Sequence, residues 1–95
     1  MELPIIRILA IIILFAFPLY AGADTKDLAS RIADEYKIPE ATLYNLVQSE
    51  SRWDENAVGD NGRAFGLVQI RTDYWPDISK AEAFDPEFAL RFAAD

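Results

Sequence analysis

One acidic side chain interrupts an otherwise apolar helical stripe. Leu43, Leu46 and Val47 are followed by Glu50 at the i, i+3, i+4 and i+7 spacing that places four side chains on one helix face. A carboxyl at the edge of an apolar face is expected to lose water, which favours its neutral form. A neutral carboxyl can donate a proton to a glycosidic oxygen, which leaves poorly as an alkoxide. Glu50 is therefore the candidate catalytic residue.

The residues that follow supply groups suited to a sugar. Asp60-Asn61-Gly62 predicts a tight hairpin turn, because Asn and Gly tolerate positive φ angles. A short half-buried strand is predicted over residues 65–70, interrupted by Gly66. Gly66 would let a ligand approach the backbone closely, and Gln69 offers an amide donor and an acceptor. We expect a helix ending near Glu50, with a small hairpin beside that end.

These residues, in this order, resemble a known family. The motifs Glu50-Ser51, Asn56-Ala57-Val58, Gly62 and Gly66-Leu67-Val68-Gln69-Ile70 resemble the soluble lytic transglycosylases (the SLT domain), relatives of goose-type lysozyme. The resemblance covers roughly residues 38–95, and Val68 stands where the family often has Met. It implies a mainly α, lysozyme-like lobe of short helices with a small β-hairpin.

The resemblance also implies a reaction that uses one carboxyl. Glu50 would protonate the oxygen between N-acetylmuramic acid and N-acetylglucosamine and then deprotonate the muramic C6 hydroxyl, which closes a 1,6-anhydro ring. Ser51 would hold the Glu50 carboxyl, while Gly66 and Gln69 would contact the glycan. The implied partner is the peptidoglycan glycan strand, with no metal and no organic cofactor. Three alternatives stay open: a goose-type muramidase that hydrolyses the same bond, a truncated, non-catalytic peptidoglycan-binding remnant, and a signal-bearing remnant with no function.

Each site residue also has a structural interpretation. Glu50 could be an ordinary carboxylate at a helix C-terminus, Ser51 could hydrogen-bond locally, and Gln69 could satisfy backbone groups of the hairpin. A second catalytic carboxylate is disfavoured, because loop acids are mostly solvated; the candidates are Asp54, Glu55 and Asp60. Several aromatic side chains could stack on sugars, but most are expected in the core of so small a domain: Tyr44, Trp53, Phe65, Tyr74 and Trp75.

The N-terminal segment has the pattern of a secretory signal. Arg7 precedes an apolar run over residues 8–17, and Ala21-Gly22-Ala23 matches a small-x-small cleavage site. Residues 1–23 are predicted to be a signal peptide that exports the chain to the periplasm, the cell envelope or the medium. An uncleaved anchor is the alternative, and membrane contact is expected only in that case. No Cys follows, which excludes a lipoprotein anchor.

Charge and composition exclude several classes of partner. Without residues 1–23 the chain keeps 15 acidic and 8 basic residues, a net charge of −7, which disfavours nucleic acid and anionic lipid as partners. The absence of His excludes a Ser-His triad and a His-based metal site. A calcium loop at Asp54-x-Asn56 is rejected, because Val58 and Phe65 occupy later ligand positions.

Helical signals recur along residues 24–95. Leu28, Ile32 and Tyr36 predict a first amphipathic helix, capped by Asp24 or Thr25. Pro39 and Glu40 suit the first turn of the helix that carries Glu50. Further on, a capping box is predicted at Ser79-x-x-Glu82, and Asp85-Pro86 opens a last helix that carries Phe88, Ala89 and Phe92 on one face.

Residues 24–95 form the single predicted domain. They provide a thin core without disulfides, and they lack the Ala-Tyr-Asn motif that the family carries further along its domain. The resemblance therefore implies the N-terminal part of a domain that is incomplete at its C-terminus. We expect this chain to fold poorly and to have little activity. A cooperative melt of residues 24–95 would contradict that expectation.

Overall fold

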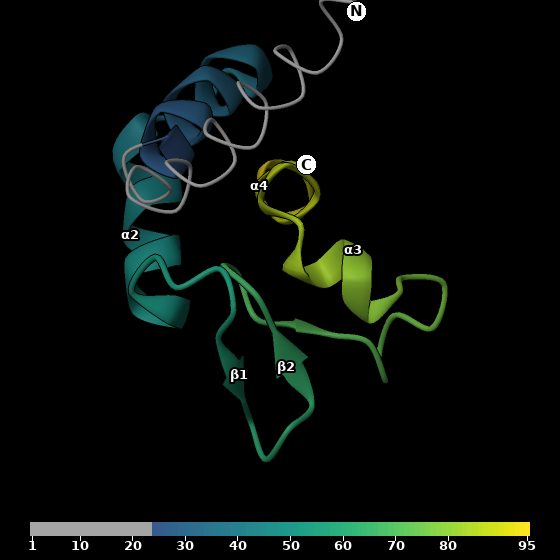
Figure 1. Ribbon diagram of the computed structural model, residues 1–95. Coiled ribbons are helices and arrows are strands. Elements are labelled where there is room, and N and C mark those ends of the chain that lie inside the picture. The colour runs from purple at the N-terminus through teal and green to yellow at the C-terminus, as the bar shows by residue number, and fades with distance from the viewer. Residues whose placement is uncertain (1–23) are drawn as a thin grey trace, which may run out of the picture.

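The computed structural model describes residues 24–95, and the predicted signal segment lies outside the described residues (Figure 1). Residues 24–36 form a first helix. The elements that follow are α2 (Glu40–Ser51), β1 (Val58–Gly59), β2 (Ala64–Phe65), β3 (Ile70–Arg71), α3 (Lys80–Phe84) and α4 (Pro86–Ala94). The described part is thus mainly helical with a small antiparallel sheet, which confirms the predicted fold class.

The two C-terminal helices begin at the predicted caps. At α3, the Ser79 hydroxyl accepts a hydrogen bond from the Glu82 backbone N–H at 3.1 Å, and the Glu82 carboxylate accepts one from the Ser79 N–H at 3.0 Å. At α4, the Asp85 carboxylate accepts from the Phe88 N–H at 3.2 Å, and Pro86 occupies the first helical position. Both caps satisfy N–H groups that have no partner inside the helix.

The boundaries of the first two helices differ slightly from the prediction. Asp24 and Thr25 are both already helical, so neither is the cap of the first helix. Lys37 follows the helix with a φ of 58°, a left-handed conformation typical of a helix C-terminus. Pro39 was expected in the first turn of α2 but is its N-cap, one residue earlier, whereas Glu40 is the acidic residue of the first turn, as predicted.

The sheet contains the predicted hairpin and one further strand. β1 and β2 are antiparallel, with Val58 opposite Phe65, and the turn between them contains Asp60, Asn61 and Gly62 at φ angles of 51°, 57° and 84°. The prediction of a single strand over residues 65–70 is wrong, however. Residues 66–69 form a turn, and β3 folds back antiparallel to β2. The interruption predicted at Gly66 is therefore a complete reversal of the chain.

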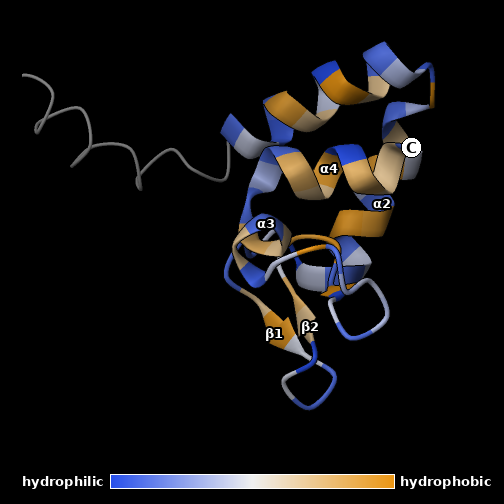
Figure 2. Ribbon diagram, turned by 90° about the vertical axis from the view of Figure 1, so that its right-hand side faces the viewer, coloured by the Kyte–Doolittle hydropathy of each residue, from blue (hydrophilic) through white to orange (hydrophobic). Residues whose placement is uncertain are grey.

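Apolar side chains from the four helices, from β2 and β3 and from the turn between these strands form one core, whereas Val58 of β1 is exposed. In Figure 2 the first helix and α4 lie side by side, and Arg91 of α4 pairs with Glu35 of the first helix at 2.7 Å. Within residues 24–95 no helix is long and apolar enough to span a bilayer. The most deeply buried large side chains are Ile32, Leu43, Val47, Leu67 and Leu90.

Candidate active site

Glu50 lies in the last turn of α2 with its side chain exposed. The predicted apolar face of α2 is confirmed, because Leu43 and Val47 are buried and Leu46 is half-buried. The expected desolvation of Glu50 is wrong, since the stripe runs past the edge of the core before it reaches this residue. No hydrogen bond or ion pair within residues 24–95 engages the carboxylate. It is therefore open to a ligand.

Ser51 directs its hydroxyl back along the helix. Its Oγ donates to the Val47 carbonyl at 3.3 Å, one turn earlier. This is the local hydrogen bond given above as the structural interpretation of Ser51. A hydroxyl that donates in this way can still accept hydrogen bonds through the lone pairs of its oxygen. The predicted contact between Ser51 and the Glu50 carboxyl stays a prediction.

Two consecutive left-handed residues turn the chain away from α2. Arg52 and Trp53 have φ angles of 52° and 67°, and the Arg52 N–H caps α2 by donating to the Gln48 carbonyl at 3.1 Å. Such angles are uncommon for residues other than glycine and need support from the surroundings. The Trp53 ring packs edge-on against Tyr44 with centroids 5.0 Å apart, and Lys26 Nζ lies 5.4 Å from it. This packing fixes the exit of the chain from the helix that carries Glu50.

The loop that follows brings two predicted site residues to one backbone oxygen. The Ala57 carbonyl accepts from the Gly66 N–H at 2.9 Å and from the Gln69 side-chain amide at 3.2 Å. The same amide nitrogen of Gln69 donates to the Gly66 carbonyl at 2.9 Å. Gly66 and Gln69 are thus held together, and their common anchor lies six residues after Ser51. Sequence analysis did not identify Ala57 as this common acceptor, because the identity of a side chain does not show which hydrogen bonds its backbone carbonyl accepts.

Gly66 allows another segment of the protein's own backbone to pack closely against it. Its φ is +82°, and a Cβ at this position would lie 2.1 Å from the Ala83 carbonyl oxygen at the end of α3. The side on which a Cβ would stand is therefore closed to a ligand. Contact between a glycan and the remaining faces of Gly66 stays a prediction.

The Gln69 side chain hydrogen-bonds to backbone groups, which is the structural interpretation given above for this residue. Its φ of 55° turns the chain into β3, and its amide nitrogen is engaged by two carbonyls. Its Oε1 would lie 2.4 Å from a Cβ built at Gly59, so Gly59 provides space for the Gln69 side chain. Sequence reasoning did not identify Gly59; the only available signal was a glycine directly before the predicted turn at residues 60–62. The glycan contact of Gln69 stays a prediction.

The three loop acids that could have served as a second catalytic carboxylate all have other partners. Glu55 accepts from the Thr25 hydroxyl at 2.5 Å, and Asp54 accepts from the Asn56 N–H at 2.9 Å. Asp60 pairs with Arg63 at 3.0 Å and also with Arg71.

Arg71 also binds Asp73, and this hydrogen bond holds the pKa of the Asp73 carboxyl below its usual value. Among these loop groups no carboxylate is left unengaged in the way that Glu50 is.

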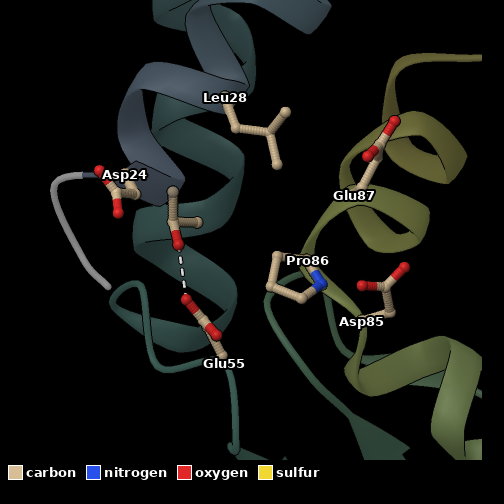
Figure 3. Close-up of a pocket in the computed structure, with 7 residues that line it drawn as sticks. Asp24, Leu28, Glu55, Asp85, Pro86 and Glu87 are labelled. Carbon is tan, nitrogen blue, oxygen red and sulfur yellow. Dashed lines mark hydrogen bonds between the residues drawn. The ribbon is translucent and has the colours of Figure 1, made fainter. Parts of the chain in front are cut away.

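A pocket of about 290 Å³ lies elsewhere, between the start of the first helix and the start of α4 (Figure 3). It contains none of the predicted site residues, so it is not the candidate active site. No group of three or more potential metal-ligating side chains occurs within the described part of the chain. The pocket is lined by Asp24, Thr25, Leu28, Glu55, Asp85, Pro86 and Glu87.

Comparison with known proteins gives one family. The family model described as the transglycosylase SLT domain matches residues 27–95, which is well over half of the chain. No curated protein and no solved structure matches the chain significantly. The matched range includes Glu50, the loop through Ala57, and both Gly66 and Gln69.

Proposed function

The chain belongs to the transglycosylase SLT domain family, which is of the peptidoglycan-cleaving lytic transglycosylase type, and from this membership we propose that Glu50 catalyses the cleavage. The bond broken is the β-1,4 link between N-acetylmuramic acid and N-acetylglucosamine. The observation that carries the proposal is the position of Glu50. It is an exposed carboxyl at the end of α2, without a partner in the described residues, inside the matched family range.

The proposed reaction proceeds in two proton transfers through one carboxyl. The Glu50 carboxyl donates a proton to the glycosidic oxygen, and the bond from that oxygen to the muramic C1 breaks with help from the substrate's acetamido oxygen. The resulting Glu50 carboxylate then accepts the proton of the muramic C6 hydroxyl. The C6 oxygen bonds to C1 and displaces the acetamido oxygen from it, and the product carries a 1,6-anhydro ring. Glu50 ends protonated as it began, and no water is consumed.

The surroundings of Glu50 support a single-carboxyl mechanism. A two-carboxylate mechanism requires a second acid placed near the first. Asp54, Glu55 and Asp60 are instead engaged with Asn56, Thr25 and two arginines. Ser51, Gly66 and Gln69 are proposed to position Glu50 and the glycan, and the anchoring of Gly66 and Gln69 on Ala57 supplies a rigid backbone for that role.

The test is digestion of purified peptidoglycan by the wild type and by Glu50→Gln. Loss of the proton donor is expected to lower the cleavage rate by roughly 10²–10⁴-fold, the usual contribution of general acid–base catalysis. Glu40→Gln is the matched control, because it makes the same change at the opposite end of the same helix. It is expected to retain activity. Substantial cleavage by Glu50→Gln would refute the assigned role.

Mass spectrometry of the released muropeptides decides between the two enzymatic alternatives. Anhydro products, lighter by one water, support the transglycosylase reaction. Reducing-end products would instead identify a goose-type muramidase that uses the same Glu50. Binding of glycan strands without any cleavage would favour a non-catalytic peptidoglycan-binding protein.

Export is a separate proposal that depends on the N-terminal segment. Arg7, the apolar run and Ala21-Gly22-Ala23 support a cleaved signal, which would bring the chain to the peptidoglycan. N-terminal sequencing of the protein isolated from the envelope or the medium is expected to begin at Asp24. A mature protein that still begins at Met1 would overturn cleavage and favour a membrane anchor.

A further inference from the structure

The pocket between the start of the first helix and the start of α4 has a mainly apolar lining. Figure 3 shows Leu28 of the first helix and Pro86 of α4 pointing into the gap from opposite sides. The pocket volume of about 290 Å³ lies just below the range of about 300–1,000 Å³ in which drug-sized ligands bind. Its size therefore suits one inserted side chain better than an organic cofactor.

Every charged side chain that lines the pocket is an acid. The four acids come from the first helix, from the loop after α2 and from the start of α4: Asp24, Glu55, Asp85 and Glu87. Among them, Glu87 alone forms an ion pair within residues 24–95, with Arg91. The pocket thus carries a net negative charge that the described part of the chain leaves largely uncompensated.

Two of these carboxylates keep an oxygen for a ligand. The Thr25 hydroxyl donates to Glu55 Oε2 at 2.5 Å, and the Phe88 N–H donates to Asp85 Oδ2 at 3.2 Å. The second oxygen of each carboxylate accepts no hydrogen bond within the described residues. Glu55 and Asp85 lie on opposite sides of the gap in Figure 3. Each side of the pocket therefore offers one acceptor that its own structural bond does not use.

The separation of the acids determines which kind of cation fits. No group of three or more potential metal ligands occurs within residues 24–95, so the acids of the pocket do not converge on one point. A calcium ion needs about six to eight oxygen ligands around it. An arginine side chain has an apolar stem that can pack on Leu28 and Pro86, and a planar guanidinium whose five N–H donors point in several directions. Arginine therefore matches both the lining and the spread of the charges.

We propose that this pocket is a docking site for a basic segment of a partner protein, which inserts one arginine side chain between Leu28 and Pro86. Its guanidinium pairs with Glu55 and Asp85. The net charge of −7 attracts such a segment, whereas it repels nucleic acid and anionic lipid. The pocket contains no residue assigned to glycan cleavage, so the docking site does not depend on the proposed function.

The experiment titrates the peptide acetyl-Ala-Arg-Ala-amide into the isotopically labelled full chain and follows the methyl signals of Thr25 and Leu28 by NMR. These signals are expected to shift until they reach saturation, and added salt is expected to weaken the binding. The matched probe carries citrulline, a neutral analogue of arginine with the same shape. It is expected to bind at least about tenfold more weakly, because its hydrogen bonds to the carboxylates are not charge-assisted. Equal binding of the two peptides would overturn the docking site.

Glu55→Gln and Asp85→Asn test the two carboxylates, and each keeps an acceptor for its structural hydrogen bond. Each variant is expected to bind the arginine peptide about threefold more weakly, as loss of one exposed ion pair does, and the double variant about tenfold more weakly. Asp34→Asn is the matched control, because Asp34 is an exposed acid of the first helix outside the pocket. It is expected to bind like the wild type.

Circular dichroism establishes that each variant keeps its helices, and the citrulline comparison on the wild type needs no variant. Unchanged affinity of the folded double variant would overturn the site.

The same methyl signals distinguish other occupants of the pocket. Tighter binding of calcium chloride than of the arginine peptide would identify a site for a point cation. A shift that grows with protein concentration in the absence of peptide would identify a second copy of the chain. A shift caused by Arg7→Gln in the unliganded protein would identify the chain's own N-terminal segment. Each of these results would overturn the partner segment as the occupant.

Discussion

At the scale of single residues, Glu50 and Gly66 show how differently two motif positions can be constrained. Glu50 is exposed and without a partner in the part that the structure describes, so its identity contributes little to packing there. Gly66 is buried at φ +82°, against the Ala83 carbonyl. A change at Glu50 is therefore expected to affect catalysis alone, whereas a change at Gly66 affects the fold.

Gly66→Ala is expected to lower the free energy of unfolding by about 3 kcal/mol or more. The new Cβ would meet backbone at 2.1 Å and would also occupy a left-handed conformation. Gly62→Ala is the matched control, because its φ is +84° but nothing lies within 4 Å of the new Cβ. It should cost only about 1 kcal/mol. Urea unfolding measures both variants, and equal losses would show that the Ala83 contact is not the cause.

At the scale of elements, short helices depend on their caps. α3 has five residues and α4 has nine, lengths at which an isolated helix is unstable in water. Ser79 and Asp85 each satisfy a backbone N–H at the start of one helix. α3 in turn supplies the Ala83 carbonyl that packs on Gly66. The cap of a short helix thus supports the turn that holds Gln69.

Asp85→Ala is expected to destabilise the protein by about 1 kcal/mol, the usual cost of losing an N-cap side chain. Asp85→Asn retains an acceptor for the Phe88 N–H and should recover most of that loss. Thermal unfolding followed by circular dichroism measures the difference. If the asparagine variant is as unstable as the alanine variant, the charge of Asp85 matters more than its hydrogen bond.

At the scale of the whole molecule, ion pairs join segments that are far apart in the sequence. Arg91 of α4 binds Glu35 of the first helix across 56 positions, and it also binds Glu87 on its own helix. The hydrogen bond from Arg91 holds the pKa of the Glu35 carboxyl below its usual value of 4.5. Because the pair is exposed, it contributes modestly and is screened by salt.

The sign of the pH dependence follows from that lowered pKa. A carboxyl whose pKa is lower in the folded state stabilises the fold above its unfolded value, and this contribution is lost as the pH falls through the folded value. Wild type is therefore expected to exceed Glu35→Gln in stability at about pH 6.5, with the difference shrinking by about pH 3 at low salt.

Denaturant midpoints at the two pH values measure this difference. Asp34→Asn is the control, since Asp34 is an adjacent exposed acid that makes no ion pair within residues 24–95. A difference between wild type and Glu35→Gln that stays constant with pH would contradict the assignment.

The sequence by itself determined the features that depend on neighbours along the chain. The α2 stripe, the hairpin turn at residues 60–62, and the caps at Ser79 and Asp85 all follow from groups within a few residues of each other. Local hydrogen bonds and backbone preferences are sufficient to specify them. The family motif around Glu50 belongs here too, because residue identities alone define it.

Only the tertiary structure decided where the backbone groups of the site are satisfied. The meeting of Gly66 and Gln69 at the Ala57 carbonyl, and the approach of Ala83 to Gly66, join segments 9 to 17 residues apart. A backbone carbonyl has the same chemistry at every position, so the sequence does not reveal which one accepts. The exposure of Glu50 has the same origin. Periodicity gives the face on which a side chain lies, but only packing shows where the core ends.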